Sequence, residues 1–237
     1  MNKPIAIIAG EPNSISSEII FKSWNLRKKF KHKPFIIIGS IRLLNLQKKK
    51  LKYNIPIKEI KHNFKEKDLI SNSLLVYNIK YSQKSAFEKI SSKSNKYIFK
   101  SFKSALKLIK EKKILGIINC PVIKEFLFKK KHLGITEYLG KKSGIKGNEV
   151  MLIYNKKLSV SPLTTHIPLS LVSRKLKKMA IVNKVKTINS FYKKYFNKKP
   201  KIAILGLNPH NSYGQTKSQE SKVIVPAIKK ILIKNPK

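Results

Sequence analysis

The stretch Pro4-Ile5-Ala6-Ile7-Ile8-Ala9-Gly10, followed by Asn13-Ser14-Ile15-Ser16, decides the fold class. Its first part is a short apolar run closed by glycine, which is typical of a buried β-strand. Its second part supplies hydroxyl and amide side chains that can cap a helix, and an apolar-periodic segment follows over residues 17–29. The chain therefore begins with a strand that passes directly into a helix.

The same alternation continues along the chain. Residues 114–119 form an apolar run of strand length, which predicts a strand covered on both faces. Alternating strands and helices predict an α/β chain with a largely parallel or mixed sheet flanked by helices. Further strands are predicted at residues 34–39, 55–60, 74–79, 150–154, 158–163 and 201–207, and helices at 85–112, 123–130, 137–142, 173–194 and 218–233.

The composition favours a globular protein with its own core. The 237 residues are 41% hydrophobic, which suits one large domain or two small ones. The single cysteine, Cys120, excludes an internal disulfide framework and fits a reducing compartment. The apolar run at residues 5–9 is too short for a signal-peptide core or a membrane span. We therefore expect a soluble, cytoplasmic protein that does not interact with membranes.

The charge of the chain is strongly positive, with a formal net charge of +42. A basic chain can indicate a nucleic-acid partner. However, only three of the 53 basic residues are arginine, and base readout and bidentate phosphate contacts favour arginine. The lysines are also spread over nearly every segment. We interpret them as a compositional bias on solvated faces, with no specific nucleic-acid partner and with nonspecific attraction to polyanions as a by-product.

Four polar motifs follow predicted strands, and ligands of open α/β sheets bind at the carboxyl ends of strands. Two motifs end in histidine, the commonest protein metal ligand. A catalytic metal takes about three protein ligands and keeps a position open. The two histidines are far apart in sequence, so spacing alone leaves open a structural role for each. The motifs are Gly10-Glu11-Pro12, Asn119-Cys120-Pro121-Val122, Thr164-Thr165-His166 and Asn208-Pro209-His210.

Other candidate sites are weaker. The first strand is not followed by G-x-G-x-x-G, and the chain contains no Walker A motif or nucleophile elbow. Ser/His/Asp catalysis stays open. Cys120 is interpreted as a small buried residue, with a nucleophilic role as the alternative. The remaining histidines, His32, His62 and His132, lie in lysine-rich segments and are predicted to be solvated.

Five segments, in order, resemble signature segments of the 4-hydroxythreonine-4-phosphate dehydrogenase family. The Thr-Thr-His and Leu-Asn-Pro-His segments are the most specific of them. The resemblance runs from about residue 4 to the end of the chain, so residues 1–237 are expected to be a single family region. The segments are Gly10-Glu11-Pro12, Pro121-Val122 with Lys124, Gly134 with Thr136-Glu137, Thr164-Thr165-His166-Ile167-Pro168-Leu169 and Leu205-Gly206-Leu207-Asn208-Pro209-His210.

The resemblance implies a fold like that of isocitrate and isopropylmalate dehydrogenases, which agrees with the missing glycine fingerprint. It implies a homodimeric enzyme of pyridoxal phosphate biosynthesis. That enzyme oxidises the secondary alcohol of 4-phosphohydroxy-L-threonine with NAD or NADP and then releases carbon dioxide. A divalent metal (Zn, Mg or Co) is held by three histidines, two of which are matched by His166 and His210. Thr136 matches a threonine that contacts the small phosphorylated substrate.

Two departures from the family pattern leave alternatives open for the substrate and for the extent of the enzyme. Ile135 stands where the family has a substrate-contacting histidine, so a paralogue acting on another phosphorylated hydroxy acid, such as 4-phosphothreonate, stays open. Family members continue past the position of Lys237 and carry their third metal histidine there. We therefore expect the chain to cover the N-terminal two-thirds or so of the enzyme, with an incomplete C-terminal part of the fold. An inactive truncated remnant is a further alternative.

Overall fold

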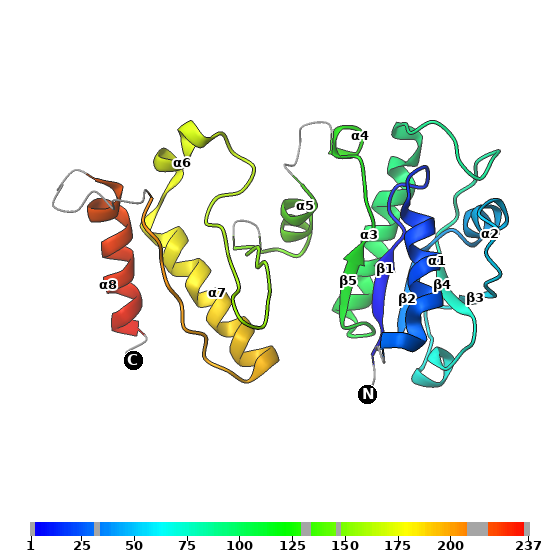
Figure 1. The fold of residues 1–237 in the computed structure, drawn as a ribbon, viewed down its shortest axis with the longest axis horizontal. Helices are drawn as coiled ribbons and strands as arrows, with labels where there is room; N and C mark the ends of the chain where they lie inside the picture. Colours follow the sequence, from blue (N-terminus) through cyan, green and yellow to red (C-terminus); the bar gives the residue numbers. More distant parts are fainter. Residues whose placement is uncertain (1–2, 31–33, 129–133, 146–147, 208–217, 235–237) are drawn as a thin grey trace. The chain divides into compact units, whose positions relative to one another are not determined.

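The computed structural model divides the chain into two compact units, Met1–Lys131 and His132–Lys237. Figure 1 traces the chain from blue at the N-terminus to red at the C-terminus. Each unit is described by itself. The residues whose structure is described are 3–30, 34–128, 134–145, 148–207 and 218–234.

The first unit is built on a five-stranded sheet with the order β3-β4-β2-β1-β5. All of its strand pairings are parallel. Parallel neighbours need crossover connections, and the helices between the strands supply them. The predicted α/β fold with a helix-flanked sheet is thus confirmed. The strands are β1 (Ile5–Ile8), β2 (Phe35–Gly39), β3 (Ile57–Ile60), β4 (Leu74–Asn78) and β5 (Gly116–Asn119).

Strand β1 lies between β2 and β5, and the three strands end level with one another. Ile8 is aligned with Ile38 of β2 and with Asn119 of β5. The segments that follow these strands therefore leave the sheet at the same edge. The prediction that β5 is covered on both faces is wrong for Ile118, which is 53% exposed. β5 is the last strand in the described sheet, and its apolar run does not predict which elements pack on its faces.

Helices cover both faces of this sheet (Figure 1). One cluster joins Phe21 of α1 and Leu44 of α2 to Ile37 and Val76 of the sheet. Because side chains alternate along a strand, Ile36 and Ile38 face the other side, where α3 contacts β1 and β2. The helical segments are α1 (Ser16–Leu26), η1 (Arg27–Phe30), α2 (Ile41–Lys50), η2 (Glu66–Leu69), η3 (Ser92–Ser94), α3 (Asn95–Lys110) and α4 (Lys124–Phe128).

Helix α3 begins later than predicted. Its buried stripe includes Ile98, Phe102 and Ala105, with the spacing of an amphipathic helix. Residues 85–91, which were predicted to belong to it, are not helical. The backbone N–H of Glu88 donates instead to the Asn13 side chain at 2.8 Å. A long-range polar contact thus replaces the local helical bond that periodicity suggests.

The second unit contains helices in its described residues, and α7 packs against α8 around Ile181, Ile224 and Ala227. The single helix predicted over residues 173–194 is two helices, because Leu176 and Lys177 have extended backbone. None of the described helices in either unit combines the length and the hydropathy needed to cross a membrane. The helices are α5 (Ile135–Lys142), α6 (Leu169–Lys175), α7 (Lys178–Phe196), the π-helical turn η4 (Glu220–Ile224) and α8 (Val225–Lys234).

Three strands predicted for this unit are absent from its described residues. Residues 150–154 and 158–163 meet only at an isolated antiparallel bridge between Ile153 and Val160. Residues 201–207 form no strand, and Leu205 is 82% exposed. A strand is stable only when a partner pairs with its backbone and an apolar surface covers one face. An apolar run in the sequence predicts neither the partner nor the cover.

Candidate functional site

Two of the four predicted motifs meet at the carboxyl edge of the sheet. Gly10-Glu11-Pro12 follows β1, and Cys120-Pro121 follows the adjacent strand β5. The Glu11 N–H donates to the Pro121 carbonyl at 2.8 Å. Gly10 has φ +69°, and a Cβ at this position would lie 2.4 Å from the same carbonyl oxygen. Glycine is therefore required for the close approach of the two strand exits.

Glu11 is buried at this edge, with 2% of its surface exposed. Its Oε2 accepts a hydrogen bond from the Ser94 hydroxyl at 2.7 Å, and its Oε1 accepts one from the Asn13 N–H at 3.2 Å. The carboxylate thus connects the exit of β1 to the segment that leads into α3. Because the carboxylate is buried, a bound substrate could not reach it, and its role is structural.

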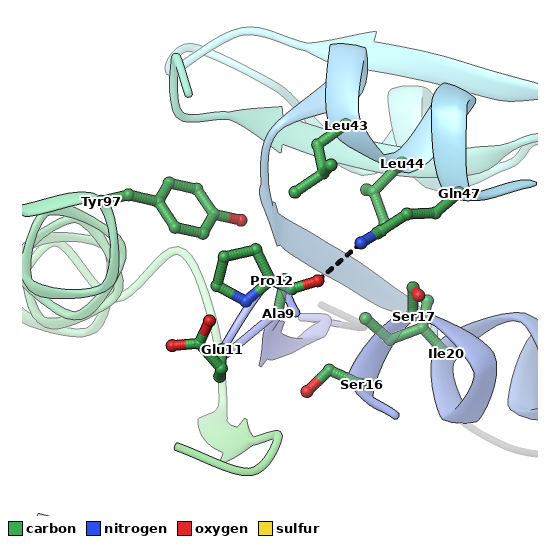
Figure 2. Close-up of a pocket in the computed structure, with 10 residues that line it drawn as sticks. All are labelled: Ala9, Glu11, Pro12, Ser16, Ser17, Ile20, Leu43, Leu44, Gln47 and Tyr97. Atoms are coloured by element: carbon green, nitrogen blue, oxygen red, sulfur yellow. Dashed lines mark hydrogen bonds between the residues drawn. The ribbon is translucent and has the colours of Figure 1, made fainter. Parts of the chain in front are cut away.

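Further polar contacts hold residues 83–88 on the turn after β1. The Asn13 Oδ1 accepts hydrogen bonds from the Gln83 side chain and the Glu88 backbone. The Gln47 side chain of α2 donates to the Pro12 carbonyl at 2.7 Å, drawn as a dashed line in Figure 2. A partly buried polar network therefore connects the exit of β1 to α2 and to residues 83–88.

A cavity of about 10 Å³ remains between this turn and α2, lined by residues that include Ser16, Ser17 and Tyr97 (Figure 2). The Ser17 hydroxyl is buried and has no hydrogen-bond partner among the described residues. A cavity of this size holds about one water molecule. It is far too small for a phosphorylated substrate, so it is not an active site.

Cys120 is 6% exposed and belongs to the apolar cluster between the sheet and α1. Burial raises the pKa of its thiol to about 11. The thiolate is the nucleophilic form of cysteine, so this environment disfavours nucleophilic chemistry at neutral pH. The structure supports the interpretation of Cys120 as a small buried residue.

The predicted site residues lie in the second unit. Thr136 is exposed in the first turn of α5. His166 is exposed and precedes α6, but it follows irregular backbone instead of the predicted strand. His210 lies outside the described residues, so the pairing of the two histidines stays a prediction. Within the described residues, no group of three or more His, Cys, Asp or Glu side chains could hold a metal.

The backbone of His166 has φ +56°, in the left-handed region. This conformation is uncommon for residues other than glycine, although histidine adopts it more often than most. Such strain persists only where the surroundings impose it, and it is frequent at functional sites. Four residues before His166, the Lys184 ammonium donates to the Pro162 carbonyl at 2.8 Å.

The role of Lys184 was missed in the sequence, where the lysines were interpreted together as a compositional bias on solvated faces. Lys184 instead lies on the face that carries the buried residues Ile181 and Val185. Burial lowers the pKa of Lys184, and the nearby Glu149 carboxylate opposes that shift. A signal was present, because positions 181, 184 and 185 share one helical face.

His62 was predicted to be a solvated surface residue, and 38% of its side chain is exposed, although the ring also has two polar partners. Its Nδ1 lies 3.2 Å from the Tyr77 hydroxyl, and its Nε2 lies 2.9 Å from a Glu111 carboxylate oxygen. The ring therefore connects β4 to the end of α3. His32 and His132 lie outside the described residues.

The family model described as pyridoxal phosphate biosynthetic protein PdxA matches residues 31–235. The chain belongs to the PdxA family. The predicted family is thereby confirmed, and the names of its relatives confirm the predicted dehydrogenase type of enzyme.

Several PdxA relatives cover nearly the whole chain. The 4-hydroxythreonine-4-phosphate dehydrogenase of Sulfurihydrogenibium sp. (strain YO3AOP1) is 36% identical, over 95% of this chain and 69% of the relative. The enzyme of the same name from Aquifex aeolicus is 34% identical, over 96% of this chain and 70% of the relative. The chain thus spans about seven tenths of the length of these relatives.

A solved PdxA-family structure agrees with the fold. The crystal structure of 4-hydroxythreonine-4-phosphate dehydrogenase from Klebsiella pneumoniae has a TM-score of 0.86 and 24% identity. The comparison covers 98% of this chain and 72% of that chain. At this identity the likeness concerns the fold alone, and it confirms the predicted isocitrate dehydrogenase-like class.

Proposed function

We propose that this chain belongs to an enzyme that oxidises and decarboxylates 4-phosphohydroxy-L-threonine with NAD or NADP and a divalent metal. The observation that carries the proposal is the Thr164-Thr165-His166 loop, in which an exposed histidine sits on a left-handed backbone. Relatives that are 36% and 34% identical are named for this activity. The loop and Thr136 belong to the same compact unit.

His166 and His210 are the residues that would hold the metal. The His166 side chain is exposed, so its imidazole is accessible to an ion, and neutral imidazole suits zinc and cobalt better than magnesium. When bound, the metal supplies a Lewis acid that stabilises the developing alkoxide and the later enolate. The polypeptide must hold His166 in its unusual backbone conformation for this purpose.

Thr136 is the proposed substrate contact. Its hydroxyl lies in the first turn of α5 and is exposed, so it can exchange hydrogen bonds with a polar ligand. The adjacent residue is Ile135, which cannot donate a hydrogen bond where the family pattern has a histidine. That observation favours a second candidate, a paralogue that oxidises another phosphorylated hydroxy acid such as 4-phosphothreonate.

We also propose a homodimeric, cytoplasmic enzyme, of which residues 1–237 represent the N-terminal two-thirds or so as a single family region. The cytoplasmic assignment is supported by the buried, free Cys120, which suits a reducing compartment. The homodimer is inferred from the family resemblance.

The test is NADH formation from each candidate substrate in the presence of Zn²⁺, Co²⁺ or Mg²⁺, combined with direct measurement of metal uptake. His166→Ala combined with His210→Ala should abolish metal uptake. Leu169→Ala, an exposed change at the start of α6, should leave it intact. Unchanged uptake in the double variant would show that the metal ligands are wrongly assigned. Faster turnover of 4-phosphothreonate would favour the paralogue.

A further inference from the structure

Lys184 of α7 bonds to the backbone that leads into the predicted metal loop. Its ammonium donates to the Pro162 carbonyl at 2.8 Å and to the Leu163 carbonyl at 3.4 Å. These two residues directly precede Thr164-Thr165-His166. An ammonium has three donors, so two of them are directed at this loop. The loop that carries His166 is thereby attached to a helix.

The Glu149 carboxylate, which is packed on α5 at Gly140, lies within electrostatic range of the same ammonium. Burial lowers the pKa of Lys184, and Glu149 raises it, so the two charges lie within electrostatic range. The Glu149 Oε2 is buried and has no hydrogen-bond partner among the described residues. A Cβ at Gly140 of α5 would lie only 2.9 Å from this oxygen. Glycine at position 140 therefore allows the carboxylate to rest against the helix that carries Thr136.

We propose that Lys184 is a positioning residue that holds two segments in fixed places within the second unit, the loop of His166 and the helix of Thr136. It acts on the loop through the two backbone carbonyls and on α5 through the charge of Glu149. Its importance for catalysis rests on the proposed function, whereas its positioning role does not.

A neutral side chain could not replace Lys184 in this arrangement. Methionine has a similar unbranched stem but neither donors nor charge, so two loop carbonyls would lose their partner and Glu149 would lose a nearby positive charge. Arginine keeps the charge and supplies donors with a different geometry, so it should restore the function in part.

The positioning role is tested by amide hydrogen exchange on the full chain for Lys184→Met, Lys184→Arg and Lys186→Met. Lys186 is an exposed lysine two residues along the same helix and is the matched control. We expect Lys184→Met to raise exchange roughly tenfold in peptides that cover residues 160–168 and 135–143. Lys184→Arg should reverse part of that change, and Lys186→Met should match the parent chain. If Lys184→Met matches Lys186→Met in both segments, the proposal is wrong.

Glu149→Gln provides a second test if Lys184→Met perturbs the whole unit. Glu149→Gln should also raise exchange at residues 135–143, and its effect should be less than additive with that of Lys184→Met, because the two groups act together. Full additivity would overturn the link between Glu149 and Lys184. Peptides from Met1–Lys131 report whether any variant unfolds the chain as a whole.

Cobalt binding, followed by the visible absorption of Co²⁺, separates this proposal from the proposed function. Loss of a group that supports a metal ligand typically weakens metal affinity about 10–100-fold, and we expect this for Lys184→Met with partial recovery in Lys184→Arg. If His166→Ala abolishes Co²⁺ binding while Lys184→Met leaves it unchanged, Lys184 does not position His166. If His166→Ala has no effect, the metal assignment fails, and the exchange data still decide the role of Lys184.

Discussion

Glu11 is a carboxylate that lies almost wholly away from solvent at the exit of β1. The Ser94 hydroxyl and the Asn13 backbone donate to its two oxygens. Such charge-assisted hydrogen bonds are shorter and stronger than neutral ones. The side chain therefore contributes to the stability of the first unit through bonds that a smaller residue could not make.

Replacing Glu11 with alanine should destabilise the first unit by about 2–4 kcal/mol, because two hydrogen bonds to a charged group are lost, and the Ser94 hydroxyl keeps only the Ser91 carbonyl, 3.2 Å away, as an acceptor. Glu18→Ala is the control. Glu18 pairs with Lys22 on the surface of α1, and such exposed pairs contribute less than about 1 kcal/mol. Urea unfolding, followed by the fluorescence of Trp24, the only tryptophan, measures the free energy of unfolding of both variants. Equal midpoints for the two variants would contradict the prediction.

Cys120 should react slowly with iodoacetamide at pH 8 in the folded chain. Burial raises its pKa to about 11, so little thiolate forms, and the side chain is also inaccessible. Denaturation in urea should restore the rate of a free thiol, which mass spectrometry can follow. Rapid labelling of the native chain would reopen the nucleophilic role.

The sequence identified individual site residues only where a motif distinguished them from other residues of the same type. Thr136 and His166 stood out through the family motifs. Lys184 did not, because it is one of 53 basic residues, and only its burial and bonding separate it from the others. Glu11 was recognised as part of a strand exit, but its burial depends on Ser94, which is distant in the sequence.

At the scale of elements, the two halves of the chain differ in how well sequence patterns predict them. The apolar runs that become β1, β2 and β4 pair with one another, so each run finds the backbone partner that a strand needs. Residues 201–207 look similar in the sequence but have no strand partner among the described residues. The local sequence pattern predicts that the backbone tends to be extended, whereas the pairing of a strand depends on the rest of the fold.

The junction of β1 and β5 should be intolerant of any side chain at position 10. Alanine at Gly10 would place its Cβ 2.4 Å from the Pro121 carbonyl oxygen, so the backbone must shift, and we expect a loss of more than about 3 kcal/mol. Gly144 is the matched control. Its φ is +76°, but a Cβ there meets no atom within 4 Å, so alanine should cost only the strain of the left-handed backbone, about 1–2 kcal/mol. Thermal melts followed by far-UV circular dichroism compare the two. A smaller loss for Gly10→Ala than for Gly144→Ala would contradict the assigned contact.

The whole molecule carries a formal net charge of +42, and the ion pairs among the described residues are few and partly exposed. Like charges at this density repel one another and oppose the compact state. Salt should relieve that repulsion, since the Debye length falls to about 10 Å at 0.1 M ionic strength.

Raising NaCl from about 20 mM to about 300 mM should therefore increase the melting temperature of the chain, because the screening length shortens across this range. Sodium acetate at equal ionic strength should act similarly, since screening depends on ionic strength and not on the anion. A large difference between the two salts would indicate specific anion binding. An unchanged or lower melting temperature in both would show that self-repulsion does not limit stability.

The polar network at the carboxyl edge of the sheet also has a consequence for the order of folding. Its hydrogen bonds join residues that are 35, 75 and 83 positions apart, as in Gln47 with Pro12, Asn13 with Glu88 and Glu11 with Ser94. Such contacts form only after long loops have closed, which is entropically costly early in folding. The strands must align before the network assembles. This edge should therefore be among the last parts of the first unit to acquire protection during refolding.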